Sequence, residues 1–287
     1  MHEFRACTVR KSLRAVGIGM LISYTLFILF ALFFSNALIF HNHGSGYRDT
    51  ADSLKLTTAD GVKISARYRE NTAAKYTVIF SHGQGEDLAD DVAWLDEIHR
   101  LGFSTFAYDY HGYGTSQGTP SEINTYRDID AAYAYVTTKL HVPANHVILY
   151  GYSLGGGPSV DLAARNPEIA GLILESTFVT VFRAKTVVTL LPFDKFDNLS
   201  KIPHVRCPVL VMHGRDDQTI PFHQGELLYN AVRTEKRCLW VDGAGHCTVK
   251  ERAGEAYAAA LHEFAALLDR VAAHNPATGS SAGGARL

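Results

Sequence analysis

The chain has 287 residues, of which 47% are hydrophobic and 20% are charged, with a formal net charge of −2. A chain of this size and composition can bury a full core in one large domain, and its near-neutral charge gives no support for a nucleic-acid-binding protein. Its four cysteines show neither C-x-x-C nor a zinc-type spacing, which argues against a zinc site and a disulfide framework. A single disulfide between Cys207 and Cys238 remains an alternative if the two residues begin adjacent strands.

The N-terminal region predicts a membrane anchor. Residues 15–40 contain no charged side chain, and this apolar run exceeds the ~20 residues that a transmembrane helix needs. The basic segment 1–14 precedes it, which favours a single-pass anchor with a cytoplasmic N-terminus and the domain that follows on the opposite side. The alternative is a signal peptide cleaved near residues 35–37, which leaves a secreted protein. The apolar region of a signal peptide is usually only about 7–15 residues long, so the anchor is the preferred prediction.

Residues 41–53 are predicted to be a linker, and one domain is expected over residues 54–272. It opens with two alternating apolar and polar runs, 54–58 and 62–68, around an Ala-Asp-Gly turn that is typical of a β-hairpin. Apolar runs then alternate with amphipathic segments, which predicts an α/β fold with a mostly parallel sheet and helices on both faces. The predicted strands are 76–80, 103–108, 147–150, 171–175, 209–212 and 238–241, and the predicted helices are 88–98, 122–140, 159–165, 222–232 and 249–271.

Two segments depart from this alternation. Residues 177–203 are predicted to form a short cap: a helix is compatible with 177–191, but Pro192 and Pro203 interrupt the pattern. The tail 273–287 is rich in Gly, Ala and Ser and is expected to be disordered.

The stretch 147–157 holds the motif with the most chemical content. An apolar run leads into Gly-Tyr-Ser-Leu-Gly at 151–155, a G-x-S-x-G sequence, and a helix-compatible segment follows. In this strand–turn–helix context a serine is held on a sharp turn with its hydroxyl exposed. Ser153 is therefore the candidate nucleophile.

A serine hydroxyl needs a base, and the base needs a carboxylate that fixes its tautomer. In doubly wound α/β sheets these groups lie in loops after the carboxyl ends of strands. Of the 14 histidines, only His246 follows a glycine-rich turn after a strand late in the chain. The acid is Asp216 or Asp217 in the loop after strand 209–212. Either choice gives the order Ser…Asp…His of the α/β-hydrolases.

The chain resembles the α/β-hydrolase family over roughly residues 54–270. The family loop His-Gly-x-x-Asp-x-x-Val-Pro, laid on residues 213–221, implies that Asp217 is the acid. The family's His-Gly turn matches residues 82–85 and implies that the Gln84 N–H is one oxyanion donor, beside the N–H of Leu154 after the nucleophile. The resemblance also implies that His82 braces this loop, and that the Asp-x-x-Gly-x-Gly segment 109–114 has a structural role.

Three segments, 193–201, 208–214 and 239–246, are similar to a membrane-associated branch of this family. That branch contains the α/β-hydrolase-domain depalmitoylases and their bacterial relatives. The resemblance implies a membrane-anchored serine hydrolase that cleaves acyl esters or thioesters of lipids, small molecules or acylated proteins through an acyl-enzyme. It needs no metal and no organic cofactor, and it binds no nucleic acid. The eukaryotic depalmitoylases attach through a lipidated, cysteine-rich N-terminus, whereas this chain has only Cys7 there.

Two other functions stay open at this point. A serine peptidase of the prolyl-oligopeptidase type uses the same triad, and nothing in the cap 177–203 separates the two. A non-catalytic, membrane-tethered binding protein on a hydrolase fold is the second alternative. The loss of a triad position would favour it, and none is lost.

Overall fold

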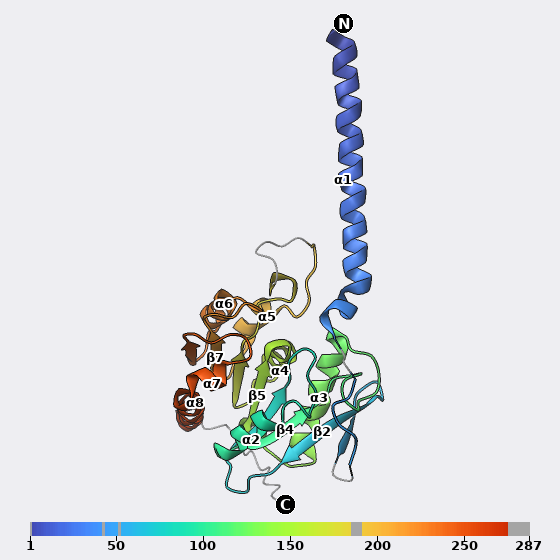
Figure 1. Ribbon diagram of the computed structural model, residues 1–287. Helices are drawn as coiled ribbons and strands as arrows, with labels where there is room; N and C mark the ends of the chain where they lie inside the picture. The colour runs from blue at the N-terminus through green and yellow to red at the C-terminus, as the bar shows by residue number, and fades with distance from the viewer. Residues whose placement is uncertain (1, 42–43, 51–52, 185–190, 275–287) are drawn as a thin grey trace, which may run out of the picture. The chain divides into compact units, whose positions relative to one another are not determined.

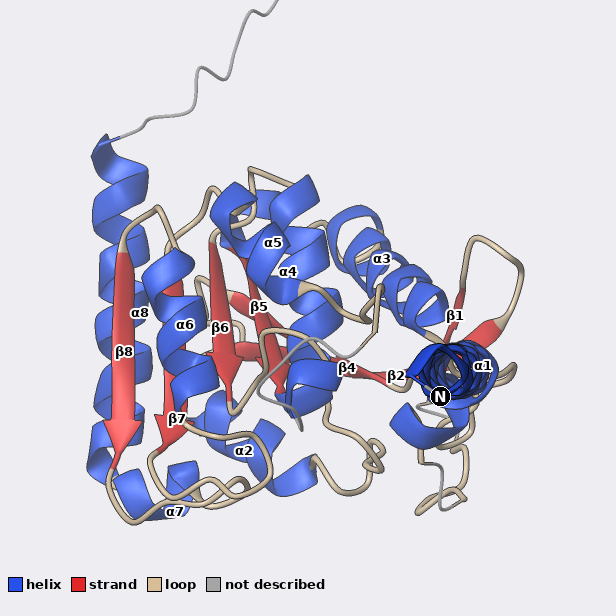
Figure 2. Cartoon of the chain, turned by 90° about the horizontal axis from the view of Figure 1, so that it is seen from above, coloured by secondary structure: helices blue, strands red, loops and turns tan. Residues whose placement is uncertain are grey.

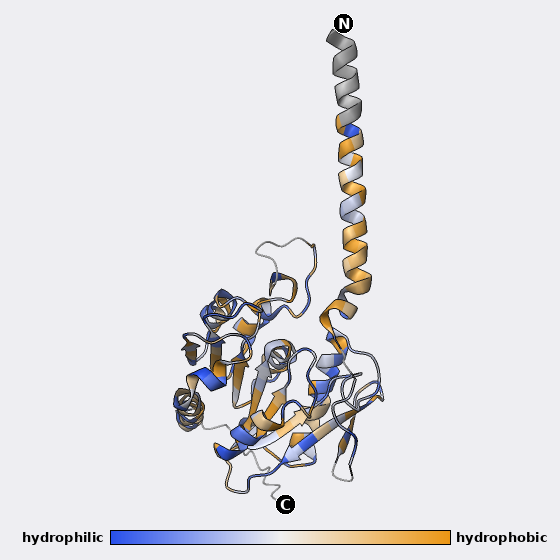
Figure 3. Ribbon diagram, viewed as in Figure 1, coloured by the Kyte–Doolittle hydropathy of each residue, from blue (hydrophilic) through white to orange (hydrophobic). Residues whose placement is uncertain are grey.

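The computed structural model describes residues 2–41, 44–50, 53–184 and 191–274, and the chain divides into two units, Met1–His41 and Asn42–Leu287. The first unit is a helix, α1 (His2–Ile39). Its segment Leu13–Ile39 is long and apolar enough to cross a membrane, and Figure 3 shows it coloured mainly as hydrophobic.

The second unit is built on an eight-stranded sheet in the order β1-β2-β4-β3-β5-β6-β7-β8 (Figures 1 and 2). The pairs β1–β2 and β2–β4 are antiparallel, and the remaining neighbours are parallel. This confirms the predicted α/β-hydrolase fold. The strands are β1 (Leu54–Thr57), β2 (Lys63–Arg69), β3 (Thr77–Ser81), β4 (Ser104–Tyr108), β5 (Val147–Tyr152), β6 (Gly171–Glu175), β7 (Val209–Gly214) and β8 (Lys236–Val241).

Helices lie on both sides of the sheet, as Figure 2 shows. Every residue of β3, β4, β5, β6 and β7 is buried, which explains why these strands read as continuous apolar runs in the sequence. The helices are α2 (Val92–Arg100), α3 (Glu122–Thr138), α4 (Gly156–Arg165), α5 (Asn198–Lys201), α6 (His223–Ala231), α7 (Val249–Ala253) and α8 (Glu255–His274).

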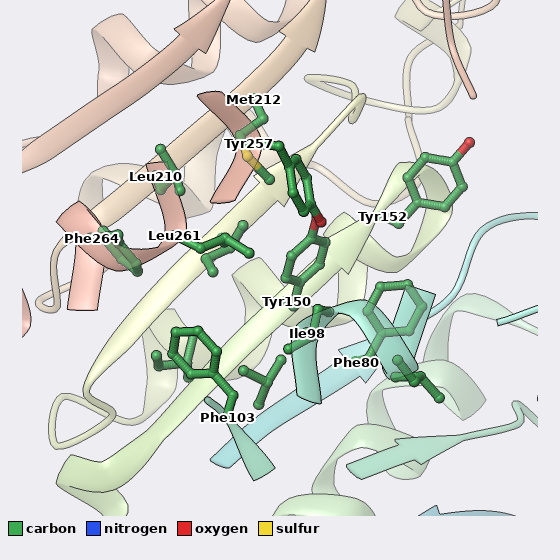
Figure 4. Close-up of a cluster of buried hydrophobic side chains, with 14 of the residues drawn as sticks. Phe80, Ile98, Phe103, Tyr150, Tyr152, Leu210, Met212, Tyr257, Leu261 and Phe264 are labelled. Carbon is green, nitrogen blue, oxygen red and sulfur yellow. The ribbon is translucent and has the colours of Figure 1, made fainter. Parts of the chain in front are cut away.

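One face of the sheet packs against α2 and α8 and forms a continuous hydrophobic core (Figure 4). Phe80 from β3 and Tyr150 from β5 lie with their ring centroids 5.2 Å apart in this core, and Phe264 from α8 is fully buried there. Because β3 to β7 run parallel to one another, their carboxyl ends lie at one edge of the sheet. The loops that follow those strands therefore meet at that edge.

Three predictions about elements were wrong in detail. The helix expected over 249–271 is two helices, α7 and α8, because Gly254 between them has φ +54° and breaks the helical path. The helix expected from Leu88 begins at Val92, because the Leu88 N–H donates to the Asp109 carboxylate and Leu88 lies in a turn. Residues 273 and 274, assigned to the tail, are the last residues of α8.

Part of the cap and most of the tail lie outside the described residues. The sequence is compatible with a helix over residues 177–184. In this segment the structure has only a 3₁₀ turn, Phe182–Ala184. Residues 185–190 and 275–287 are not described. The Cys207–Cys238 pair is not formed, since both thiols are free. The strand register explains this: Cys238 is opposite Val211, whereas Cys207 precedes the start of β7.

Candidate active site

Ser153 lies on a sharp turn between β5 and α4. Its φ is +49°, a left-handed conformation that is uncommon for a residue with a side chain and that recurs at functional sites. The turn needs glycine at 155, because a Cβ there would lie 1.9 Å from the carbonyl oxygen of Ser81. The nucleophile turn therefore packs directly against the end of β3.

The structure brings together the three residues expected to form a triad. His246 Nε2 lies 2.9 Å from Ser153 Oγ, and His246 Nδ1 lies 2.8 Å from Asp217 Oδ2. Asp217 is buried, whereas the neighbouring Asp216 is exposed. Of the two aspartates that spacing alone leaves open, Asp217 is the one whose carboxylate contacts His246.

The surroundings of Asp217 favour its charged form. Burial raises its pKa, but hydrogen bonds with His213 and His246 and from the Ile220 N–H outweigh burial, and the pKa lies well below its usual range. The Thr219 and Ile220 N–H groups each donate to Oδ1 at 2.8 Å. Asp217 is thus a fixed carboxylate with one oxygen directed at His246, as a residue that orients a base requires.

The structure also shows contacts to the backbone of His246 and Ser153 that were not predicted. The backbone carbonyl of His246 accepts hydrogen bonds from Ser176 Oγ at 3.1 Å and from the Tyr152 hydroxyl at 3.4 Å. Thr177 Oγ1 donates to the carbonyl of Ser153 at 2.7 Å. All three donors lie at or just after the carboxyl ends of β5 and β6. The only feature of the sequence that could have indicated these donors is their position at or directly after the ends of buried strands.

The two residues expected to supply oxyanion donors lie on neighbouring segments. Leu154 is the second residue of the 3₁₀ turn Ser153–Gly155, and the first N–H groups of a helical turn have no partner inside it. Gln84 is exposed in the loop after β3. This loop is held from within, because the Gly83 N–H donates to Glu86 Oε2 at 2.7 Å.

His82, in the same loop, packs against aromatic side chains. Its ring centroid is 4.1 Å from that of Tyr110, and the side chain is fully buried. Burial lowers the pKa of His82 to about 4, so its imidazole is neutral at pH 7. These contacts agree with the bracing role that the family resemblance implied.

No group of three or more His, Cys, Asp or Glu side chains among the described residues has a geometry that holds a metal ion.

Comparisons with known proteins agree with the fold. A family model described as serine aminopeptidase, S33, matches residues 72–193. Alpha/beta hydrolase domain-containing protein 17B of Xenopus tropicalis is 39% identical over 212 residues, which is 72% of this chain and 73% of that protein. The human protein of the same name is 38% identical over the same shares.

Solved structures share the fold at low sequence identity. An esterase of Pyrococcus furiosus has a TM-score of 0.67 at 17% identity, covering 79% of this chain and 99% of its own. An esterase of Exiguobacterium antarcticum has a TM-score of 0.57 at 18% identity, covering 73% and 98%.

These relations define a serine hydrolase of the α/β-hydrolase class. Within that class, the chain belongs to the family of alpha/beta hydrolase domain-containing protein 17.

A buried acid beneath the site leads to a prediction about stability. Glu175 ends β6 and accepts a hydrogen bond from the Tyr150 hydroxyl, which lies 2.8 Å from the Tyr257 hydroxyl (Figure 4). Burial raises the pKa of Glu175 from 4.5 to about 8. The folded state therefore holds a proton that the unfolded state has lost, and this contribution to stability is lost as the pH rises through about 8.

Replacing Glu175 by glutamine, which cannot ionise, should flatten this dependence. Between about pH 5 and about pH 8.5, the Tm of the wild-type protein should fall by several degrees more than that of the variant. Thermal melts followed by circular dichroism measure the difference. Glu226→Gln, at an exposed position, serves as the control and should follow the wild type. Parallel pH dependence of wild type and Glu175→Gln would contradict the assignment.

Proposed function

We propose that this protein is a membrane-anchored serine hydrolase that cleaves acyl esters or thioesters through an acyl-enzyme. The observation that carries the proposal is the continuous hydrogen-bond chain from Ser153 Oγ through His246 to Asp217. Such a chain converts a weakly nucleophilic hydroxyl into an attacking group. The esterases with the same fold and the α/β-hydrolase relatives support the reaction class.

In the first half-reaction, Ser153 Oγ attacks the acyl carbonyl while His246 Nε2 takes the hydroxyl proton. The N–H groups of Leu154 and Gln84 stabilise the oxyanion of the tetrahedral intermediate. The bond to the leaving group then breaks, and His246 gives its proton to the departing oxygen or sulfur.

In the second half-reaction, a water molecule attacks the acyl-enzyme. His246 again acts as the base, and the protonated imidazole returns its proton to Ser153 as the carboxylic acid leaves. Asp217 stays ionised in both halves, because it orients His246 and stabilises the imidazolium without accepting its proton. The residues of this chain therefore supply every group that the two half-reactions need.

The proposed location follows from the N-terminal segment. The apolar segment Leu13–Ile39 supports a membrane anchor, and the basic residues before it favour a cytoplasmic N-terminus with the hydrolase unit on the opposite side. Protease protection of sealed vesicles tests this topology. A hydrolase unit cleaved by protease added on the cytoplasmic side would contradict it.

A comparison of substrates with different leaving groups tests whether the protein cleaves esters and thioesters or peptides. The description of the matching family model as an aminopeptidase makes a peptidase the main competitor. We expect p-nitrophenyl acyl esters and acyl thioesters to be hydrolysed with a kcat/KM at least about 100-fold higher than that of aminoacyl-p-nitroanilides. The reverse order would favour a peptidase. A folded protein that cleaves none of these substrates and does not react with a fluorophosphonate would favour a binding protein.

A further inference from the structure

Gly46 and Tyr47 lie against the loop that carries Gln84. They follow the apolar helix in the sequence and precede the first strand of the hydrolase unit. We propose that these two residues, here called the strap, are positioning residues for the oxyanion loop, defined as residues 82–88. The inference rests on the proposed serine hydrolase activity. It adds two residues that affect catalysis indirectly, by fixing the position of the oxyanion loop.

Two buried carboxylates join the strap to the oxyanion loop. Asp87 Oδ2 accepts the Gly46 N–H at 2.6 Å, while its Oδ1 accepts the N–H of Ala89 at 2.8 Å. Asp109 repeats this arrangement from the end of β4.

Asp109 Oδ2 accepts the Tyr47 hydroxyl, and its Oδ1 accepts the Leu88 N–H at 2.9 Å. Asp87 and Asp109 are both almost fully buried. Each carboxylate thus binds the strap with one oxygen, and with the other it binds a backbone N–H at or directly after the end of the oxyanion loop.

The Asp-x-x-Gly-x-Gly segment leaves a space for the strap. A Cβ at Gly114 would lie 1.9 Å from Asp109 Oδ2 and 2.8 Å from Tyr47 Cε1, so only glycine lets the phenol reach the carboxylate. Gly114 also has φ +50°, a conformation that favours glycine. Thr115 Oγ1 lies 3.2 Å from the Tyr47 hydroxyl on the same side. The segment predicted to be structural is therefore the docking site of Tyr47.

The donors of the strap do not ionise near neutral pH. Burial raises the pKa of Tyr47 to about 12, so its hydroxyl stays a hydrogen-bond donor. Without the strap, Asp87 and Asp109 would each lose one donor in a buried environment, which is costly unless the neighbouring backbone rearranges. The neighbouring backbone is the oxyanion loop.

The strap acts on the C-terminal end of this loop, through the carboxylates of Asp87 and Asp109 and the Leu88 N–H. Gln84 precedes Leu88 by four residues in the same loop. An oxyanion donor must be held within a few tenths of an ångström of its productive position, so a small displacement of this loop lowers the rate of the chemical step more than it lowers substrate binding.

The test uses the full-length protein in detergent micelles and the variant Tyr47→Phe, which removes only the hydroxyl. We expect kcat for a p-nitrophenyl ester to fall about tenfold with KM changed by less than about twofold. The inhibition constant of an alkyl boronic acid, which forms a tetrahedral adduct with the nucleophile, should rise by a similar factor. Tyr133→Phe, at a half-buried tyrosine of α3 distant in sequence from the strap, is the matched control and should behave as the wild type.

Hydrogen–deuterium exchange gives a second measurement that does not depend on activity. In Tyr47→Phe, peptides that cover residues 82–88 should exchange faster, while peptides from β5 and β6 exchange at the wild-type rate. Unchanged exchange in 82–88 together with unchanged kcat would overturn the inference. A wild-type protein that is inactive on every ester, with faster loop exchange in Tyr47→Phe, would instead contradict the proposed function and leave the strap supported.

Discussion

Replacing Ser153 by alanine should lower kcat for a p-nitrophenyl acyl ester by about 10⁴-fold or more, with little change in the fold. The variant keeps the oxyanion donors but has no oxygen to form the acyl-enzyme. Its reaction with a fluorophosphonate probe should be lost as well. Both measurements are made on the detergent-solubilised protein, with circular dichroism as the check on folding.

Ser200→Ala is the matched control for this experiment, since Ser200 is an exposed serine within α5. It should be labelled and active as the wild type is. Undiminished labelling of Ser153→Ala would show that another residue reacts with the probe and would remove the basis of the proposed function.

Replacing Asp217 by asparagine should lower kcat by about 10³–10⁴-fold. The amide keeps the size of the side chain but cannot stabilise the imidazolium, and it favours the wrong tautomer of His246. Because the pKa of Asp217 lies well below its usual range, the wild-type residue is a carboxylate throughout the neutral pH region. The loss should therefore appear at every pH between about 6 and 9, as measured by steady-state ester hydrolysis.

Asp216→Asn provides the comparison, because Asp216 is adjacent but exposed. We expect its kcat to stay within about threefold of the wild-type value. Equal losses in the two variants would indicate damage to the loop after β7, and a larger loss in Asp216→Asn would reverse the assignment of the acid.

Much of this arrangement could be predicted from the order of residues along the chain. Ser153 was predictable because a strand, a glycine-flanked serine and a helix in succession leave few other conformations. His246 was predictable because the carboxyl ends of parallel strands meet at one edge of the sheet, so a late strand brings its loop to the serine. Asp217 needed the family resemblance, because Asp216 follows the same strand and spacing does not separate two adjacent aspartates.

Other contacts depend on packing between segments that have no common sequence pattern. No sequence pattern marks Ser176 as part of the site. Its hydroxyl lies 3.1 Å from the His246 carbonyl only because the fold brings the two loops together. Tyr47 lies in a stretch that was predicted to be a linker because its composition is polar and glycine-rich. Its role depends on the space left by the absent side chain of Gly114, and no local sequence preference predicts that space. Gly254 was passed over because one glycine does not interrupt the apolar spacing of a helical pattern.

The sheet order has a consequence for the time at which the enzyme gains activity. Ser153 and His246 are 93 residues apart in the chain, and β8, which precedes His246, is the last strand of the sheet. During synthesis the N-terminal helix and the serine turn emerge long before the segment that carries the base. Parallel pairing between distant segments is also slow to form. Under the proposed mechanism, the nascent chain therefore cannot cleave acyl groups before β8 has paired with β7.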